Sequence, residues 1–509
     1  MNFPFDNTFA EQMTGFYAPW QGASVPDPQV ALFNRELAQW LGLDAESLDS
    51  AEGAAIFAGA VAPEGASPLA QVYAGHQFGG FSPQLGDGRA LLVGELIDPR
   101  GARWDLHLKG SGPTPFSRGG DGKASLAPVL REYLIGEAMH ALGVPTSRAL
   151  AAVTTGEPVR RNGRALPGAV LARIASSHLR VGTVEFFARR GQHDHVRQLV
   201  DYALRRHAPD RAEADDPALE LLRFVRDRQA ALVARWMGIG FVHGVMNTDN
   251  TTLSGETIDY GPCAFMDRFD PGTVFSSIDH GGRYAYGNQP SIMQWNVARL
   301  AECLLPLFDA PDIDAALEIA NHEVDAFGAV HQRAWRDVLS AKLGLTDEGP
   351  GRGALAEPGV DPDDDALARD LFTLLQEQEA DFTGFFRHLS AALLGDSPQL
   401  RSLLREPKAA EGWLERWRTR VGVPADADAR REALAGDRAR GMNRFNPLYV
   451  PRNHVVEEAL QTAERELDLG PVKRLLAVLA DPFTRQEGAE DLEHPAPVDA
   501  APFVTFCGT

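Results

Sequence analysis

The stretch FVHGVMNTDNTTL (241–253), followed by TIDYGPCAFMD (257–267), decides the fold class of this chain. Between short apolar runs it places a histidine, His243, an asparagine, Asn250, and an aspartate, Asp259. Asn and Asp side chains supply the oxygen ligands that Mg²⁺ prefers, and one or two protein ligands suffice when phosphate oxygens complete the shell. The two loops therefore predict that Asn250 and Asp259 bind Mg²⁺.

The spacing of His243, Asn250 and the triplet Asp259-Tyr260-Gly261 is also that of the catalytic and metal-binding loops of protein kinases. In that frame the catalytic base should stand two residues after His243, but Val245 occupies the position. Asp249 is the one carboxylate in this loop placed to accept a proton from an attacking hydroxyl, so we predict it to be the base. The alternative is that NTDN is an ordinary Asx-rich turn.

Upstream, WDLHLKG (104–110) reads as a strand that ends in a lysine, Lys109. A lysine that reaches phosphate from a strand needs a glutamate on the following helix, and Glu132 in LREYL is the expected partner. Glu137 is a rival on a different face of the same helix. The alternative is that Lys109 is a surface residue at a strand end.

Glycine-containing loops lie on both sides of this lysine, in GDGR (86–89) and in GSGPTPFSRGGDGKA (110–124). Such loops let backbone N–H groups approach a phosphate, although a hairpin turn explains a single one equally well. Two arginines follow an apolar strand. Arginine can bind phosphate through its planar fork, so these two side chains are candidates for phosphate contacts. The alternative is that both arginines form salt bridges at helix ends. The glycine loops contain Gly86, Gly88, Arg89, Asp121 and Gly122, and the two arginines that are candidates to bind phosphate are Arg173 and Arg180.

The composition excludes several classes of function. The 509 residues carry a net charge of −21, so nucleic acid is not expected as a partner. Three cysteines form no disulfide framework or zinc motif, and neither a signal peptide nor a membrane span is visible. We therefore expect a cytoplasmic protein. The pair of histidines in GQHDHV (191–196) is expected in a solvated loop rather than at a metal.

Strand-like segments (90–97, 104–110, 149–155, 168–175) dominate the first part of the chain, where one helical segment (125–143) lies between them, and the later segments (216–237, 291–308) are helical. This order predicts a two-lobed α+β fold. The run 347–365, rich in Pro, Gly and acidic residues, is expected to be a surface linker.

Several of these motifs together resemble the selenoprotein O family: YAGHQFGGFSPQLGDGRA (73–90), LKGSGPTPFSRGGDGKA (108–124), GVMNTDN (244–250), DYGP (259–262) and FNPLYVPRNHVVEEAL (445–460). The resemblance implies a pseudokinase of protein-kinase-like fold that binds ATP in a flipped orientation and transfers AMP to Ser, Thr or Tyr hydroxyls of proteins. It implies an N-terminal arm (1–65), a strand-rich N-terminal lobe (66–180), a helical C-terminal lobe (181–345) and a mainly helical C-terminal region (346–509).

The resemblance also implies roles for single residues. Asp249 would be the proton acceptor, Asn250 and Asp259 would bind Mg²⁺, and Glu132 would orient Lys109. The nucleotide contacts would be Gly86, Gly88, Arg89, Lys109, Asp121, Gly122, Arg173, Arg180 and Asp259.

Some members of the family carry a redox-active residue near the C-terminus, and Cys507 matches that place. Its partner position is Phe275 here, which argues against an internal disulfide; Cys263 lies in the same segment, nearer to the metal ligand. A kinase-like phosphotransferase and a non-catalytic ATP-binding scaffold are the rival functions. The sequence leaves open whether UTP with Mn²⁺ can replace ATP with Mg²⁺.

Overall fold

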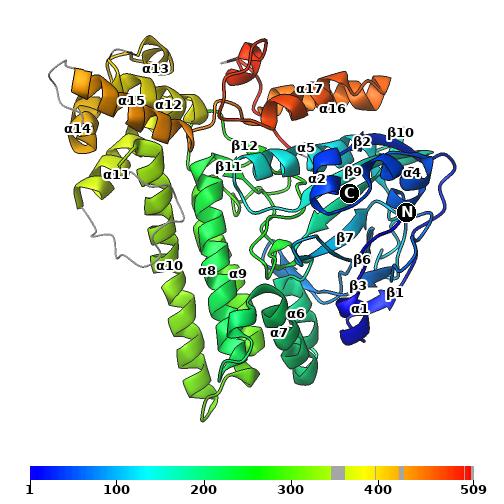
Figure 1. Cartoon of the computed structure of the whole chain (residues 1–509). Helices are drawn as coiled ribbons and strands as arrows, with labels where there is room; N and C mark the ends of the chain where they lie inside the picture. Colours follow the sequence, from blue (N-terminus) through cyan, green and yellow to red (C-terminus); the bar gives the residue numbers. More distant parts are fainter. Residues whose placement is uncertain (346–361, 396, 423–428, 498, 506–509) are drawn as a thin grey trace.

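The computed structural model describes residues 1–345, 362–395, 397–422, 429–497 and 499–505. Its fold is mixed α/β, with one large antiparallel sheet and many helices (Figure 1). The sheet has the order β1-β3-β6-β7-β10-β9-β2, and β8 pairs with β10 outside this path. Its strands are β1 (Tyr17–Pro19), β2 (Gln29–Phe33), β3 (Leu69–Gln71), β6 (Ala90–Ile97), β7 (Arg103–Lys109), β8 (Ala124–Ser125), β9 (Arg148–Arg161) and β10 (Arg164–Ala175).

The strand β7 shows how the sequence divides the sheet into two faces. Successive side chains of a strand point to opposite faces. Leu106 and Leu108 are buried in an apolar cluster with the N-terminal helices α2 (Arg35–Trp40), α3 (Ala45–Leu48) and α4 (Ala51–Phe57). The alternate residues Asp105, His107 and Lys109 face the other side. That side therefore carries a row of polar side chains, which we call the polar row.

The polar row is closed at one end by the helix α7 (His193–His207). Arg206 of this helix is buried and donates to Asp105 Oδ1 at 2.6 Å and to Glu95 of β6. At the other end Lys109 lies beside helix α5 (Leu126–Ala141), which packs against β9 and β10. The polar row thus runs from a buried charge cluster to the edge of a cavity described below.

The first 65 residues share the sheet with the residues that follow. Strand β1 pairs with β3 at one edge, and β2 pairs with β9 at the other. The short helix α1 (Thr8–Gln12) packs near α7 through the contact of Phe9 with Tyr202. Both outer strands of the main sheet therefore come from this N-terminal segment.

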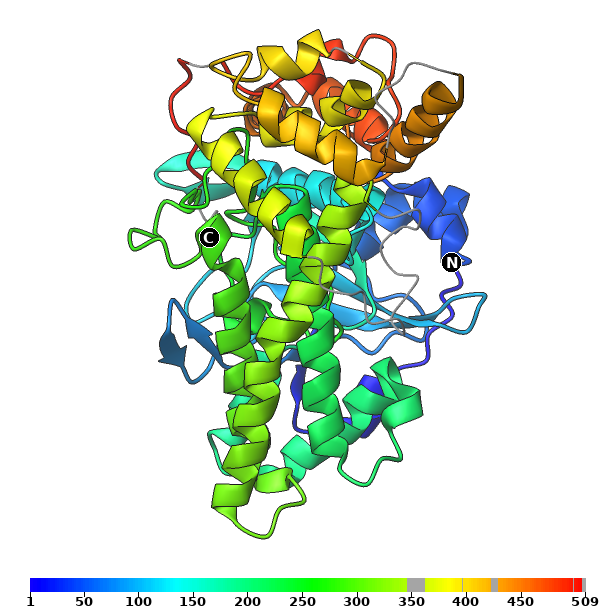
Figure 2. The ribbon, with the colours of Figure 1, turned by 90° about the vertical axis from the view of Figure 1, so that its left-hand side faces the viewer.

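Long helices form the part of the chain that follows the sheet. They are α6 (Val181–Ala188), α8 (Pro217–Gly238), α9 (Gln289–Leu304) and α10 (Ile313–Leu343), of which α8, α9 and α10 lie side by side (Figures 1 and 2). Asp216 caps α8 by accepting from Leu219 N at 3.0 Å, and Pro217 occupies its first turn, as expected for a helix start. The small strands β11 (Phe241–Val242) and β12 (Ala264–Phe265) bracket the loops that contain Asn250 and Asp259.

The prediction of a loop at 191–196 is wrong for the residues from His193 onward, which are helical. Helix α7 begins at His193, and Asp194 lies in its first turn, where an acidic side chain stabilises a helix. The His195 ring stacks on Phe187, with ring centroids 5.1 Å apart, and is partly buried, whereas His193 is exposed to solvent as expected.

The C-terminal region is helical. Its helices are α11 (Pro362–Glu377), α12 (Phe382–Leu389), α13 (Pro398–Ser402), α14 (Glu411–Val421), α15 (Ala429–Asn443), α16 (Asn453–Glu466) and α17 (Gly470–Leu479). Of the expected linker at 347–365, residues 347–361 lie outside the described residues and residues 362–365 begin α11. Buried Arg452 forms an ion pair with Asp381 within this region and joins the region to the rest through Asp267, both at 2.7 Å. Within the described part of the chain, no helix is long and apolar enough to cross a membrane.

Candidate active site

A cavity of about 500 Å³, which we call the central cleft, lies between the polar face of the sheet and the loops 245–262. It gathers residues from distant parts of the sequence. The predicted residues that line it are Gly86, Gly88, Arg89, Lys109, Asp121, Gly122, Arg173, Arg180, Asp249, Asn250 and Asp259. Glu132 is the one predicted site residue that stands outside this lining, and it contacts Lys109 from α5.

Lys109 is held by two carboxylates. Its Nζ lies 2.6 Å from Glu132 Oε2 and 2.5 Å from Asp259 Oδ1. Glu137, the rival partner, instead binds Arg148 at 2.6 Å and Asn34 at 2.8 Å, on another face of α5. Of the two candidate glutamates, the helix therefore presents Glu132 to the lysine.

Asp259 is surrounded by cations. Besides Lys109, Arg173 Nη1 lies 2.9 Å from its Oδ1 and Arg180 Nη1 lies 3.7 Å from its Oδ2. Burial alone would raise the pKa of Asp259, but Lys109 and the two arginines outweigh burial and hold that pKa well below its usual range. The backbone of Asp259 has a left-handed φ of +60°, which is uncommon outside glycine and is found at functional sites. The three cations thus favour the ionised form of the Asp259 carboxylate.

Asn250 presents an oxygen to the same cleft. Its amide nitrogen donates to Val245 O at 3.1 Å, which leaves the amide oxygen for another partner. The oxygens of Asn250 and Asp259 are hard donors of the type that Mg²⁺ takes. Among the described residues there is no group of three or more His, Cys, Asp or Glu side chains that could hold a metal by themselves. The donor set therefore fits a cation that is bound partly by phosphate.

Asp249 has the environment of a proton acceptor near neutral pH. Its side chain is buried, Gln77 Nε2 donates to its Oδ2 at 3.0 Å, and Oδ1 has no partner among the described residues. Burial raises the pKa of Asp249 to about 7, and the hydrogen bond from Gln77 offsets only part of that rise. A base is most effective when its pKa lies near the working pH. Val245, at the position of the kinase base, only lines the cleft.

The strand that begins at Gly75 approaches Asp249 closely. A Cβ atom on Gly75 would lie 2.5 Å from Asp249 Oδ1, which is shorter than any ordinary contact. Thr248, the residue before Asp249, donates to Glu185 of α6. Glycine at position 75 and this hydrogen bond together fix the Asp249 carboxylate at the side of the cleft.

The two arginines reach the cleft in different ways. Arg173 is buried and its Nη1 also binds Glu132 Oε1 at 2.9 Å, while its Nε donates to His107 at 3.3 Å. Arg180 stacks on the Tyr73 ring at 4.3 Å and donates to Asp249 O at 2.9 Å, with Nη2 unpartnered in the described structure. Arg173 lies within β10, away from any helix end, whereas Arg180 is the N-cap residue of α6 and forms an ion pair with Asp259, as the alternative of a helix-end salt bridge describes.

The glycine loops form one wall of the cleft. Gly86 and Gly122 have φ values of +82° and +65°, and a Cβ on Gly122 would lie 2.2 Å from Gly112 O. Asp121 is held by both Arg161 nitrogens, at 2.8 and 2.9 Å. Arg161 lies at the far end of β9, where no local pattern in the sequence connects it with Asp121.

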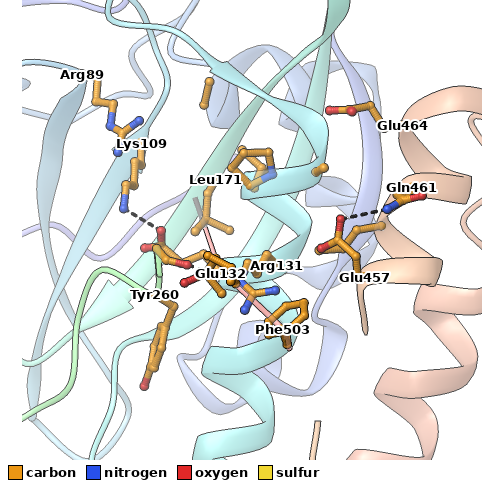
Figure 3. A pocket seen from close by; sticks show the side chains of 18 of the residues that line it. Arg89, Lys109, Arg131, Glu132, Leu171, Tyr260, Glu457, Gln461, Glu464 and Phe503 are labelled. Carbon is orange, nitrogen blue, oxygen red and sulfur yellow. Dashed lines mark hydrogen bonds and ion pairs between the residues drawn. The ribbon is translucent and has the colours of Figure 1, made fainter. Parts of the chain in front are cut away.

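Sequence reasoning missed Gln77, Tyr73 and Arg161. Gln77 and Tyr73 stand in the segment 73–90. The motif at its end, Gly86 to Arg89, predicted a nucleotide-binding loop, but no pattern in the sequence pointed to Gln77 or Tyr73. A second cavity of about 440 Å³ adjoins the central cleft at Arg89 and Lys109 (Figure 3). In Figure 3 the Lys109–Glu132 pair lies at one side of that cavity, and Glu457, Gln461 and Glu464 of α16 lie at the other.

The cysteines show no disulfide among the described residues. Cys263 and Cys303 are buried and free, and Cys507 lies outside the described residues. Phe275 packs against Phe503, with ring centroids 6.2 Å apart, and Thr505 N donates to Phe275 O at 2.8 Å. The segment that ends at Thr505 therefore contacts position 275 without a covalent bond.

Comparison with known proteins agrees with this geometry. A family model described as "Protein adenylyltransferase SelO" matches residues 1–480. Proteins named "Protein nucleotidyltransferase YdiU" are similar over their full length or nearly so. The relative from Cereibacter sphaeroides (strain ATCC 17025) is 56% identical over 510 residues, with 100% of both chains covered. The relative from Sphingopyxis alaskensis is 53% identical, with 100% of both chains covered. The relative from Rhizobium leguminosarum bv. trifolii is 52% identical, with 100% of this chain and 97% of the relative covered.

A cleft with cations, a buried carboxylate and two oxygen donors, in a chain so similar to these relatives, defines a nucleotidyltransferase that acts on proteins. The chain belongs to the SelO family.

Proposed function

We propose that this protein transfers AMP from ATP to Ser, Thr or Tyr hydroxyls of other proteins. The observation that carries the proposal is Asp249, a buried carboxylate whose pKa is about 7, in a loop whose kinase-base position holds Val245. Both Asp249 and Val245 line the central cleft, and Asp249 is the one of the two that can accept a proton. The family description, which names an adenylyltransferase, supports the choice of the α-phosphate as the site of attack.

In the proposed reaction Asp249 accepts the proton of the acceptor hydroxyl as its oxygen attacks the α-phosphorus. The bond to the bridging oxygen breaks, and pyrophosphate leaves. Asn250 and Asp259 would hold Mg²⁺, which, when bound, neutralises the charge of the phosphates. Glu132 orients Lys109 through the contact at 2.6 Å, so that the ammonium group can meet the phosphates instead of solvent.

The remaining residues of the cleft bind the nucleotide in this proposal. Arg173 and Arg180 supply fixed cations, and the Nη2 of Arg180, which has no partner among the described residues, is a donor that a phosphate oxygen would satisfy. Backbone N–H groups of the loops at Gly86, Gly88 and Gly122 approach the nucleotide where a side chain would not fit. Arg89 and Asp121 line the same wall. Mg²⁺ is the proposed metal, and Mn²⁺ is an alternative that the oxygen donors also suit.

We also propose that the fold is protein-kinase-like, with two lobes and flipped ATP between them. The order along the chain supports this proposal: the strands β6 and β7 come first, then the helix α5 with Glu132, then the strands β9 and β10, and then the loops with Asn250 and Asp259. The proposed units are the arm 1–65, the lobes 66–180 and 181–345, and the region 346–509. The proposed compartment is the cytoplasm, and proteins are the proposed partners.

One experiment tests the transferred group. The protein is incubated with Mg²⁺ and ATP labelled at either the α- or the γ-phosphate, and the modified protein is identified by intact mass. We expect α-label and a mass increase of one AMP. Stable γ-label on a hydroxyl would refute the proposal in favour of a phosphotransferase. Binding of ATP without transfer of either label would identify a scaffold.

A further inference from the structure

The hairpin of β4 (Gly75–Gln77) and β5 (Gly80–Ser82) projects from the body of the molecule (Figure 2). It forms its own two-stranded sheet, which would be only marginally stable if isolated. Its residues are instead tied to the loop of the proposed base. His76 N donates to Thr248 Oγ1 at 2.7 Å, and Gln77 donates to Asp249 itself. The hairpin therefore has a fixed position beside Asp249.

The tip of this hairpin presents aromatic side chains to solvent. Phe78 and Phe81 are each 37% exposed, and Ile278, which also lines the cleft, is 53% exposed. Phe78 has a φ of +51°, which is a strained conformation for a bulky residue. Its backbone N–H is held by Asn247 at 3.1 Å and by the Tyr284 hydroxyl at 3.2 Å. Such strain is maintained by the surroundings and is concentrated at functional sites.

Two arginines without a carboxylate partner in the described structure flank the same tip. Arg190 donates to Phe186 O at 2.7 Å and to Pro83 O at 2.9 Å, and it stacks on the Phe186 ring. Arg283 lies over the Trp295 ring at 4.8 Å, and its Nε has no hydrogen-bond partner in the described structure. The nearby Asp279 accepts from the backbone N–H groups of Arg283 and Tyr284. The positive charges of Arg190 and Arg283 are thus not neutralised by a carboxylate among the described residues. This contrasts with the protein as a whole, whose net charge is −21.

We propose that this surface, composed of Phe78, Phe81, Ile278, Arg190 and Arg283, docks the acceptor segment of the protein substrate. The proposal rests on the proposed function and names its substrate class. The fitting partner is an extended acidic segment with an apolar residue beside the hydroxyl. Its apolar side chain packs on the hairpin tip, its carboxylates meet the arginines, and its hydroxyl reaches Asp249. The rest of this acidic protein would repel such a segment, so recognition depends on these two cations.

The test uses two synthetic peptides with one central Tyr beside a Leu. The peptides are identical except that the other flanking residues are Asp and Glu in one and Lys in the other. We expect the kcat/KM of the wild type to be at least about tenfold higher for the acidic peptide than for the Lys-containing peptide. The reason is that the two partly exposed arginines attract the acidic peptide and repel the basic one. The double variant R190E/R283E should reverse this preference.

The control variant is R205E/R465E, which changes the net charge equally at exposed positions outside the hairpin. It should keep the acidic preference. None of these four arginines lines the central cleft, so the affinity for ATP should be unchanged in both variants. Phe81→Ser should raise KM for the acidic peptide without a change in kcat. Equal kcat/KM for the two peptides in the wild type, or an acidic preference that persists in R190E/R283E, would overturn the proposal.

Binding of the same peptides separates this proposal from the proposed function. Fluorescence anisotropy with a non-hydrolysable ATP analogue reports docking without transfer. If the acidic peptide binds preferentially but receives no AMP, the docking surface stands and the proposed reaction fails. If AMP is transferred to proteins but the two peptides bind equally, the reaction stands and the docking surface is wrong.

Discussion

Replacement of Asp249 by asparagine should separate proton transfer from nucleotide binding. The amide keeps the shape of the side chain and removes its charge. General base catalysis contributes about 10²- to 10⁴-fold, so single-turnover transfer of AMP should slow by a factor in that range, or about 3–5 kcal/mol in the barrier. ATP affinity should persist, because Arg173, Lys109 and Asp259 keep their mutual contacts.

The same substitution should change stability in a pH-dependent manner. The pKa of Asp249 rises from 3.8 to about 7 on folding because the carboxyl is buried. A raised carboxyl pKa means that the folded state binds the proton more tightly, so stability falls as the pH rises from about 4 to about 7. The amide that replaces the carboxyl does not titrate. Asp249→Asn should therefore gain stability over the wild type at pH 8 relative to pH 5, by up to about 2.6 kcal/mol.

The assay pairs three measurements on one preparation of metal-free and then Mg²⁺-loaded protein. Transfer is followed with α-labelled ATP, affinity by calorimetry and stability by thermal unfolding at pH 5 and pH 8. Loss of ATP binding together with transfer would show that Asp249 is a metal ligand or a structural residue. Transfer at the wild-type rate would show that the proton goes elsewhere. A stability difference independent of pH would contradict the raised pKa.

Three further substitutions test the neighbouring groups. Asp259→Ala should abolish transfer by removing the ionised oxygen donor, and rate measurements over a range of Mg²⁺ concentrations will show whether excess metal restores it. Arg180→Lys should lower kcat/KM for ATP at least about tenfold, because an ammonium group replaces neither the planar fork nor the stacking on Tyr73; unchanged kinetics would contradict a phosphate contact. Gly75→Ala should slow transfer while ATP affinity persists, since its Cβ would displace Asp249, and calorimetry with single-turnover kinetics will show whether the two effects separate.

Much of the secondary structure follows from local pattern. The strand expected at 90–97 is β6, that at 104–110 is β7 shifted by one residue, and the helix expected at 125–143 is α5 (Leu126–Ala141). Alternation and helical spacing are properties of neighbouring residues, so a single sequence carries them. The pairing of Lys109 with Glu132 can be anticipated for a similar reason, because a strand and the next helix are close in the chain.

Other parts of the site depend on contacts that no spacing shows. Gln77 and Asp249 are 172 residues apart and meet because the hairpin β4–β5 folds onto the loop that contains Asp249. Asp121 and Arg161 meet through the register of β8, β9 and β10. The strands β1 and β2 escape prediction because they are short edge strands whose pairing depends on the finished sheet. The helix start at His193 is hard to predict because its N-cap residue, Gln192, makes no side-chain capping hydrogen bond.

The contacts of Arg206 constrain how the family's sequences can diverge. Arg206 on α7, Asp105 on β7 and Glu95 on β6 are all buried, so replacing one of them leaves a charge without its counterpart. Such a loss costs about 3–5 kcal/mol, a large fraction of the roughly 5–15 kcal/mol that keeps a typical protein folded. Replacing all three charged residues by apolar ones is therefore less destabilising than replacing a single one of them. Across homologous sequences these three positions should therefore change together or not at all.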